Sequence, residues 1–181
     1  MIISTSQLTN MCSNHYFLKY ILLILLCTYS GKEEDIFTEV GCCYIINHIL
    51  KEDTKGIEEQ RQVSCMSQAI LYEAYGESKK GKILVAQVIY NRAKTWGMTF
   101  CEVVNEKRGR RYQFSYHHKL KYRMWFNKRT YKEADVISRG VIIKGITTSV
   151  LFFKRCDIEN KGFEGLIFKL EVGNHCFYGR V

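Results

Sequence analysis

The sequence predicts an α+β protein, mainly helical, with a small antiparallel sheet or hairpin near its C-terminal end. Apolar residues recur at helical spacing in the middle of the chain, most densely in GKILVAQVIYNRAKTW (81–96). Short β-like runs follow near the end, TSVLFF (148–153) and IFKLEV (167–172). Helices first and strands last is the order typical of an α+β domain.

The composition indicates one globular domain with a polyanionic partner. The chain has 181 residues, of which 46% are hydrophobic and 13% aromatic, so a disordered chain is excluded. Its net charge is +9 and its pI is near 9.1. Such a charge favours nucleic acid, acidic lipid surfaces or bacterial wall polymers, and it does not choose between them.

The first 30 residues form a separate segment. In FLKYILLILLCTYS (17–30), Lys19 precedes a short apolar run and small residues follow it, which is the pattern of a secretory signal. The run is shorter than the about 20 residues that a bilayer span needs. We therefore predict a signal peptide or membrane anchor over 1–30, with 17–30 as the tether in the second case. The protein is then exported: periplasmic, extracellular or membrane-anchored facing the cell wall.

The next segment is predicted to be a charged helical linker over 31–62, followed by the folded domain over 63–181. Apolar residues at helical spacing predict a helix over 33–51. The polar run EDTKGIEEQRQ (52–62) is interpreted as a connector. Ser64 is the predicted N-cap of a helix over 65–75 that ends at Gly76.

Five further elements follow in the domain. Ser78 begins the second helix, which is apolar nearly all round and is therefore expected at the centre of the domain. The other predicted elements are a short helix over 100–105, a basic and aromatic loop with helical pieces over 107–128, a helix over 130–145, and a C-terminal hairpin turning at Gly173-Asn174.

The cysteines predict no metal site. The chain has eight cysteines, and the six that follow residue 30 allow 15 pairings, so none is assigned. No C-x-x-C motif occurs, and the histidines lack zinc-binding spacing. We expect neither a metal nor a cofactor.

Glu73 stands out within LYEAYGE (71–77). At 100° per residue it shares a helix face with Met66, Ala69 and Ile70, so it points towards a core or a cleft. A carboxyl on an apolar wall has a raised pKa, as a general acid needs near neutral pH. The alternative is a rolled helix with Glu73 at its rim, paired with a lysine.

Five sequence blocks follow one another along the chain: LYEAYGE (71–77), Gly81 with VAQVIYNR (85–92), FCEVV (100–104), QFSY (113–116) and GNHCFY (173–178). In content and order they resemble the SleB-type cell-wall hydrolase family, which includes spore-cortex-lytic enzymes and bacterial and phage wall hydrolases. The resemblance spans about 64–180.

The resemblance implies a lysozyme-like fold and cleavage of peptidoglycan glycan strands between N-acetylmuramic acid and N-acetylglucosamine. Residues 63–181 would be the catalytic domain, acting as a monomer, with Glu73 as the catalytic acid. Lytic transglycosylation by a single glutamate is the expected reaction, and hydrolysis stays open. The chain departs from the family beside QFSY, where Tyr112 and His117 replace flanking cysteines, and at Lys154, where the family has a histidine. These departures touch the walls around the substrate.

The resemblance also supplies candidates for substrate binding. Gln113 and Ser115 would bind sugar hydroxyl or N-acetyl groups, and Phe114 or Tyr116 would pack on a sugar face. Phe114 in the core is the equal alternative. Tyr178 would meet the substrate or pack within the hairpin.

Three polar residues are predicted to support the site. Glu77 supports it directly or caps the helix that follows, where its charge meets the helix dipole. Gln87 and Asn91 lie one turn apart on a buried helix, where amides need partners. They would hold Glu73 or the cleft backbone, or serve as structural hydrogen-bonding groups.

Two other functions compete with the glycosidase. A catalytically degenerate module would bind glycan, or nucleic acid through KRGRR (107–111) and the basic, aromatic run 117–129; the family resemblance makes nucleic acid the less favoured partner. A cysteine hydrolase would use Cys65 or Cys101 with a histidine, His117 or His175, but neither cysteine has a local signature for it.

Overall fold

The computed structural model describes residues 36–115, 117, 126–145, 147–159 and 161–180. The predicted signal or anchor over 1–30 lies outside these residues. The chain divides into two compact units, residues 1–57 and 58–181. Within the described ranges, no helix combines the length and the apolar character that crossing a bilayer requires.

Helix α3 runs without interruption from Ile36 to Glu73. The connector predicted over 52–62 and the N-cap predicted at Ser64 are therefore wrong. The run 52–62 is rich in Glu, Gln, Lys and Arg, which favour helix even on a fully solvated surface. Glu58 accepts hydrogen bonds from Arg61 at 2.7 Å and from Gln62 at 2.6 Å, at the spacings that stabilise one helical turn.

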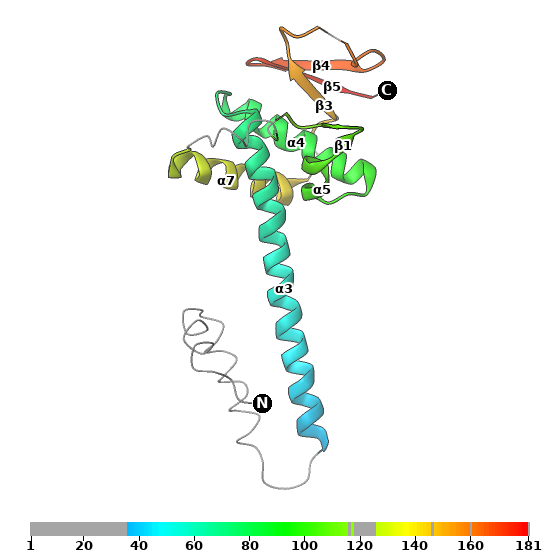
Figure 1. Ribbon diagram of the computed structural model, residues 1–181. Helices are drawn as coiled ribbons and strands as arrows, with labels where there is room; N and C mark the ends of the chain where they lie inside the picture. The colour runs from blue at the N-terminus through cyan, green and yellow to red at the C-terminus, as the bar shows by residue number, and fades with distance from the viewer. Residues whose placement is uncertain (1–35, 116, 118–125, 146, 160, 181) are drawn as a thin grey trace. The chain divides into compact units, whose positions relative to one another are not determined.

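Helix α4, Lys79–Trp96, is the central helix of unit 58–181, as predicted. Ser78 caps its N-terminus by accepting a hydrogen bond from the Gly81 amide, and Gly97 ends it with a φ of +66°. Ten of its residues are buried, and they lie on several faces of the helix. It packs against α5, α7 and β3, which Figure 1 shows around it.

The shorter helices of unit 58–181 also begin at polar caps. Helix α5, Phe100–Asn105, starts with a capping box between Thr99 and Glu102. Helix α7, Lys128–Lys144, begins two residues before its predicted start because Asn127 caps it by accepting from the Thr130 amide. Both helices confirm the sequence prediction.

Two very short strands lie within the segment predicted as loop with helical pieces. Strand β1, Lys107–Arg108, pairs antiparallel with β2, Arg111–Tyr112. The run 107–112 has no apolar alternation to predict a strand, because the hairpin exposes nearly all of its side chains. Gly109, with a φ of +60°, occupies the turn.

A three-stranded antiparallel sheet follows in the order β3-β5-β4. Its strands are Phe152–Arg155, Ile167–Val172 and His175–Gly179. Strand β5 is central and all of its residues are buried. The predicted hairpin of β4 and β5 is confirmed, with Gly173 at a φ of +59° in its turn. Together with the helices, this sheet confirms the predicted α+β class (Figure 1).

The strand predicted over 148–153 is only partly correct, because β3 begins at Phe152. The carbonyl groups of Thr148 and Val150 accept hydrogen bonds from Asn91, at 2.9 and 2.8 Å. The Leu151 carbonyl accepts one from Arg92 at 2.7 Å. Side chains of α4 therefore bind the backbone that the sequence pattern assigned to a strand.

Among the described residues, two disulfides connect segments that are distant in sequence. Cys65 of α3 is bonded to Cys101 of α5, and Cys156 is bonded to Cys176 of β5. Cys101 is 4% exposed, and Cys65 packs against the main core cluster, to which residues of α3, α4, α5 and α7 contribute. The first disulfide thus joins α5 to the helix that ends at Glu73.

Candidate active site

Glu73 is the last residue of α3 and lies at the edge of the core. Met66, Ala69 and Ile70, which were predicted to share its face, are at most 1% exposed, whereas Glu73 itself is half-buried. The chain leaves the helix here through a turn in which the Glu77 amide donates to the Ala74 carbonyl at 3.1 Å. The carboxylate therefore stands at the end of an apolar row, partly open to solvent.

Ser115 is the polar partner that the structure places at this carboxylate. Its hydroxyl lies 3.1 Å from Oε1 and 3.0 Å from Oε2 of Glu73, within donating distance of both oxygens. Ser115 is exposed, and it lies 42 positions further along the chain. Two of the motif blocks recognised in the sequence thus meet at one acid group.

The loop that presents Ser115 is held from both sides. Its neighbour Phe114 is 1% exposed and packs in the core beside Phe153, with ring centroids 6.1 Å apart. The flanking residues Tyr112 and His117 stack at 3.8 Å with an angle of 15° between their planes. This stacked pair closes the loop at the two positions where the family pattern has cysteines.

The burial of Phe114 corrects one prediction. A ring that is 1% exposed has no face left for a sugar, so Phe114 is a core residue that positions Ser115. Gln113 is half-buried. Its backbone N–H donates a hydrogen bond to the backbone carbonyl of Glu106 at 2.9 Å, which continues the β1–β2 pairing. Tyr116 lies outside the described residues.

Glu77 has a role that its position in the sequence did not predict. Its side chain is only 6% exposed, and its carboxylate accepts hydrogen bonds from the backbone amide of Asn174 at 3.3 Å and from the Asn174 side chain at 3.1 Å. His175 Nδ1 lies 3.7 Å from Oε1. The cap of α4 is Ser78 instead, so the prediction of Glu77 as a helix cap is wrong. Glu77 binds the β4–β5 turn to the start of α4.

Replacing Gly173 by Ala tests this contact. Gly173 has a φ of +59°, and a Cβ built there would lie 1.8 Å from Glu77 Oε2. We expect a loss of about 2–3 kcal/mol in the free energy of unfolding, from left-handed strain together with displaced hydrogen bonds. Denaturant titration followed by circular dichroism measures it.

Gly165→Ala is the matched control, because Gly165 also has a positive φ, +80°, with open space where its Cβ would be. It should lose only the strain contribution. Equal losses in the two variants would contradict a specific contact between Glu77 and the turn.

Gln87 and Asn91 are structural hydrogen-bonding residues. Gln87 donates to the Gly145 carbonyl at 3.0 Å and accepts from the Thr147 amide at 3.1 Å. Asn91 binds the backbone of 148–150, as described above. The two amides thus fix the backbone segment that leads into β3.

Tyr178 packs within the C-terminal sheet. It is 8% exposed, and its ring lies 5.0 Å from that of Phe163 and 5.8 Å from that of Phe168. The prediction of a substrate contact is therefore corrected to packing within the hairpin, since little of the side chain is left exposed. His175 is likewise buried, with Phe153 edge-on at 5.3 Å.

Arg92 is a buried cation to which sequence reasoning gave no role, although it ends the block VAQVIYNR. Its guanidinium lies 5.0 Å from the centroid of the Phe152 ring and 5.4 Å from those of Trp96 and Phe114. Burial lowers the pKa of Arg92 to about 10, against the opposing effect of the nearby Glu106 carboxylate. Arg92 therefore remains charged at neutral pH. It lies between Phe114, the neighbour of Ser115, and Phe152 of β3.

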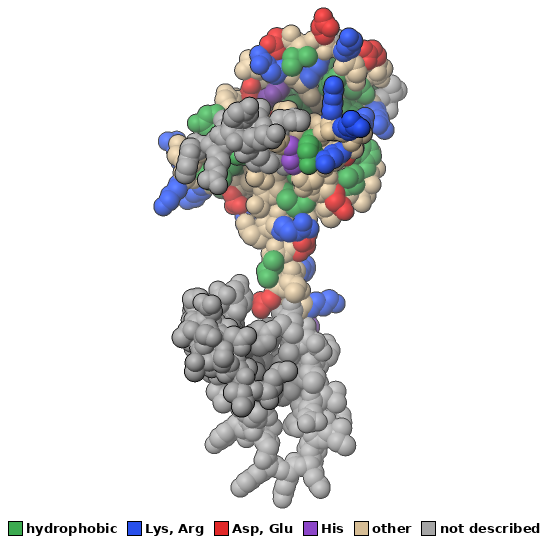
Figure 2. Space-filling model, viewed as in Figure 1, with side chains coloured by type: hydrophobic (Ala, Val, Ile, Leu, Met, Phe, Trp, Pro, Cys, Tyr) green, Lys and Arg blue, Asp and Glu red, His purple; other side chains and the backbone are tan. Residues whose placement is uncertain are grey.

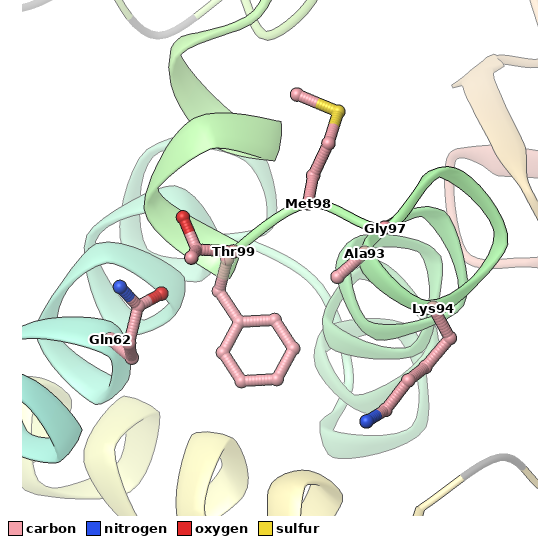
Figure 3. Close-up of a pocket in the computed structure, with 7 residues that line it drawn as sticks. Gln62, Ala93, Lys94, Gly97, Met98 and Thr99 are labelled. Carbon is pink, nitrogen blue, oxygen red and sulfur yellow. The ribbon is translucent and has the colours of Figure 1, made fainter.

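A pocket of about 350 Å³ lies between α3, the end of α4 and the start of α5. Figure 3 shows Gln62 from α3 and Ala93 and Lys94 from α4 on opposite sides of it. The remaining lining residues are Gly97, Met98, Thr99 and Phe100. None of the lining side chains is an acid, so this pocket offers no proton donor for glycan cleavage.

In the described part of the chain, one group of three side chains has the residue types that can bind a metal ion: Cys156, Glu171 and Cys176. The two cysteines form a disulfide, so their sulfur atoms are not available as thiolates.

Comparisons with known proteins agree on one family. A family model described as Cell Wall Hydrolase matches residues 76–178, a range that starts just after Glu73. No curated protein matches the sequence.

Two solved structures share the fold. The catalytic domain of the Bacillus cereus SleB protein aligns with a TM-score of 0.53 at 23% identity, covering 66% of this chain and 90% of its own. The catalytic domain of the germination-specific lytic transglycosylase SleB from Bacillus anthracis aligns with a TM-score of 0.50 at 23% identity, covering 66% and 94%. The likeness confirms the expected lysozyme-like architecture.

Proposed function

This chain belongs to the cell wall hydrolase family, and on that premise we propose that it cleaves peptidoglycan glycan strands with Glu73 as its catalytic acid. The bond is the β-1,4 linkage between N-acetylmuramic acid and N-acetylglucosamine, and the reaction is lytic transglycosylation.

One observation carries the proposal: the contact between Ser115 and Glu73. This contact connects the end of α3 to the QFSY block. The Glu73 carboxylate is half-buried, so it lies beside the core and is still partly open to solvent. A donor at this position holds the carboxylate in one orientation, as a proton-transferring group requires. The family membership supplies the substrate class, and the fold of the two SleB domains is consistent with it.

The proposed reaction uses one carboxyl group twice. Protonated Glu73 gives its proton to the glycosidic oxygen, and the bond from that oxygen to the muramoyl C1 breaks. The carboxylate then takes the proton of the muramoyl C6 hydroxyl, whose oxygen closes on C1 to give a 1,6-anhydro end. If water enters in place of that hydroxyl, the same carboxylate activates it and the product has a reducing end.

A single acid fits the surroundings of Glu73. Ordinary glycosidases use two carboxylates at a defined separation. Glu77, the next acid along the chain, is buried against Asn174 and binds the β4–β5 turn. We propose that the N-acetyl group of the substrate stabilises the charge that develops at C1, in place of a second carboxylate. Gln113 and Ser115 are proposed to bind sugar hydroxyl or N-acetyl groups.

The two alternative functions differ in their support. The cysteine hydrolase is wrong for Cys65 and Cys101, because the two sulfur atoms are bonded to each other. A degenerate module that binds glycan without cleaving it is the second candidate, since Lys154 and the pair of Tyr112 and His117 depart from the family pattern around the site.

The location follows from the substrate. An enzyme that acts on the cell wall must be exported, and residues 1–30 carry the pattern of a signal peptide or anchor. We propose 63–181 as the catalytic domain and 31–62 as the segment that links it to this N-terminal part.

Incubating the purified full chain with isolated peptidoglycan tests the proposal. We expect soluble muropeptides with 1,6-anhydromuramoyl ends, identified by mass spectrometry because they are lighter by one water than reducing ends. Reducing ends would replace transglycosylation by hydrolysis. Binding to peptidoglycan without any release would favour the degenerate module.

A further inference from the structure

The hairpin of β1 and β2 carries a dense group of exposed cations beside the candidate active site. Lys107, Arg108, Arg110 and Arg111 are all exposed, and Lys and Arg side chains gather on the visible face of the molecule in Figure 2. Arg108 lies 3.8 Å from the Glu106 carboxylate. Within the described ranges, no other ion pair neutralises this group of four.

Two of the cations face each other across the hairpin. Arg108 and Arg111 are cross-strand partners, so their Cβ atoms are about 5 Å apart on one face of the ribbon. Like charges placed directly opposite destabilise a strand pair, and a two-stranded hairpin is only marginally stable by itself. An anion bound between the two guanidinium groups would remove this repulsion.

The opposite face of the hairpin attaches it to the domain. Lys107 and Tyr112 are the other cross-strand pair, and the Lys107 ammonium lies 4.4 Å from the Tyr112 ring centroid. Tyr112 in turn stacks on His117, as described above. Because side chains alternate between the two faces of a strand, Arg108 and Arg111 point away from this attachment.

The hairpin is close along the chain to Ser115, whose hydroxyl contacts Glu73. Arg111 precedes Ser115, the hydrogen-bond partner of Glu73, by four positions, which even a fully extended chain cannot stretch beyond about 14 Å. A glycan strand extends further than this from the bond that is cleaved, so the guanidinium groups lie at a distance that a strand bound at Glu73 can span.

We propose that Arg108 and Arg111 bind carboxylate groups carried by the peptide substituents of the glycan strand next to the bond that is cleaved. This inference rests on the proposed function and adds a substrate preference to it. Guanidinium groups bind carboxylates with two parallel hydrogen bonds, and the peptides of peptidoglycan end in free carboxylates. The hairpin thus selects strands that retain charged peptides.

Binding measurements in the Glu73→Gln background test this without cleavage. The full chain is sedimented with insoluble peptidoglycan from which phosphate-containing polymers have been removed. The same peptidoglycan, with its carboxyl groups converted into amides by carbodiimide and ammonia, is the uncharged probe. We expect Arg108→Gln/Arg111→Gln to bind the charged strands about tenfold more weakly than the parent, and both proteins to bind the amidated strands equally.

The matched control is Lys79→Gln/Lys80→Gln, which removes the same charge from two exposed positions at the start of α4. It should change binding less than about twofold if the effect is local rather than due to net charge. Thermal unfolding checks that all variants are folded.

Three results would overturn the proposal: unchanged binding in the Arg108/Arg111 variant, an equal loss in the Lys79/Lys80 control, or an equal loss on amidated strands. A loss seen only with DNA or with a phosphodiester wall polymer would assign the hairpin to that ligand instead. Failure of the wild-type protein to release muropeptides contradicts the proposed function alone, because the binding assay uses no turnover.

Discussion

Replacing Glu73 by Gln is expected to slow the release of muropeptides by about 10²–10⁴-fold, the usual contribution of general acid–base catalysis. Gln has nearly the same shape, and its amide oxygen can still accept the hydrogen bond from Ser115. It cannot give or take a proton at the glycosidic oxygen. The variant should therefore bind peptidoglycan and unfold like the wild type, since Glu73 is only half-buried at the end of its helix.

Glu59→Gln provides the matched control, because Glu59 is an exposed acid on the same helix and undergoes the same chemical change. It should release muropeptides at the wild-type rate. Release at the wild-type rate by the Glu73 variant would remove Glu73 from the mechanism, whereas loss of its cooperative unfolding would show that the side chain acts through the fold.

Removing the disulfide between Cys65 and Cys101 is expected to cost about 3–4 kcal/mol in the free energy of unfolding. The two cysteines are separated by 36 positions, and the chain-entropy model gives this range for a closed loop of that length. The measurement is guanidinium unfolding of Cys65→Ala/Cys101→Ala beside the wild type under oxidising conditions. The bond joins α5 to α3, so the variant should also lose muropeptide release at a lower temperature than the wild type.

A reducing agent supplies the control for this prediction. Reduction should lower the stability of the wild type by more than that of the double variant, because among the disulfides of the described residues the variant keeps only that of Cys156 and Cys176. If the double variant unfolds at the wild-type denaturant concentration, the bond contributes nothing, and the packing of α5 on α3 holds the site together without it.

Wherever a local signal was complete, the sequence predicted the structure. Helix α4 has a cap at Ser78, a left-handed glycine at Gly97 and apolar residues all round, and it lies at the centre of its unit as expected. The β4–β5 hairpin follows from two strand-like runs around Gly173-Asn174. The oddity of Glu73 on an apolar face was likewise visible from its spacing alone, because helical periodicity needs no knowledge of distant residues.

The candidate site needed contacts between distant segments. The four residues QFSY do not by themselves show that Phe114 packs in the core instead of against a sugar. They also do not show that Ser115 contacts Glu73, which lies 42 positions away. The position of Glu77 in the sequence is that of a helix cap, but in the folded protein its carboxylate accepts a hydrogen bond from the β4–β5 turn.

The same reason explains the other corrections. The pattern of 148–153 is that of a strand, yet Asn91 and Arg92 donate hydrogen bonds to three of its backbone carbonyl groups, those of residues 148, 150 and 151. The eight cysteines allow many pairings, and folding alone decides which sulfur atoms approach each other. Periodicity and caps are properties of neighbouring residues and can be read along the chain. Burial, strand pairing and hydrogen-bond partners depend on contacts between residues that are distant in sequence. These contacts form only when the chain folds.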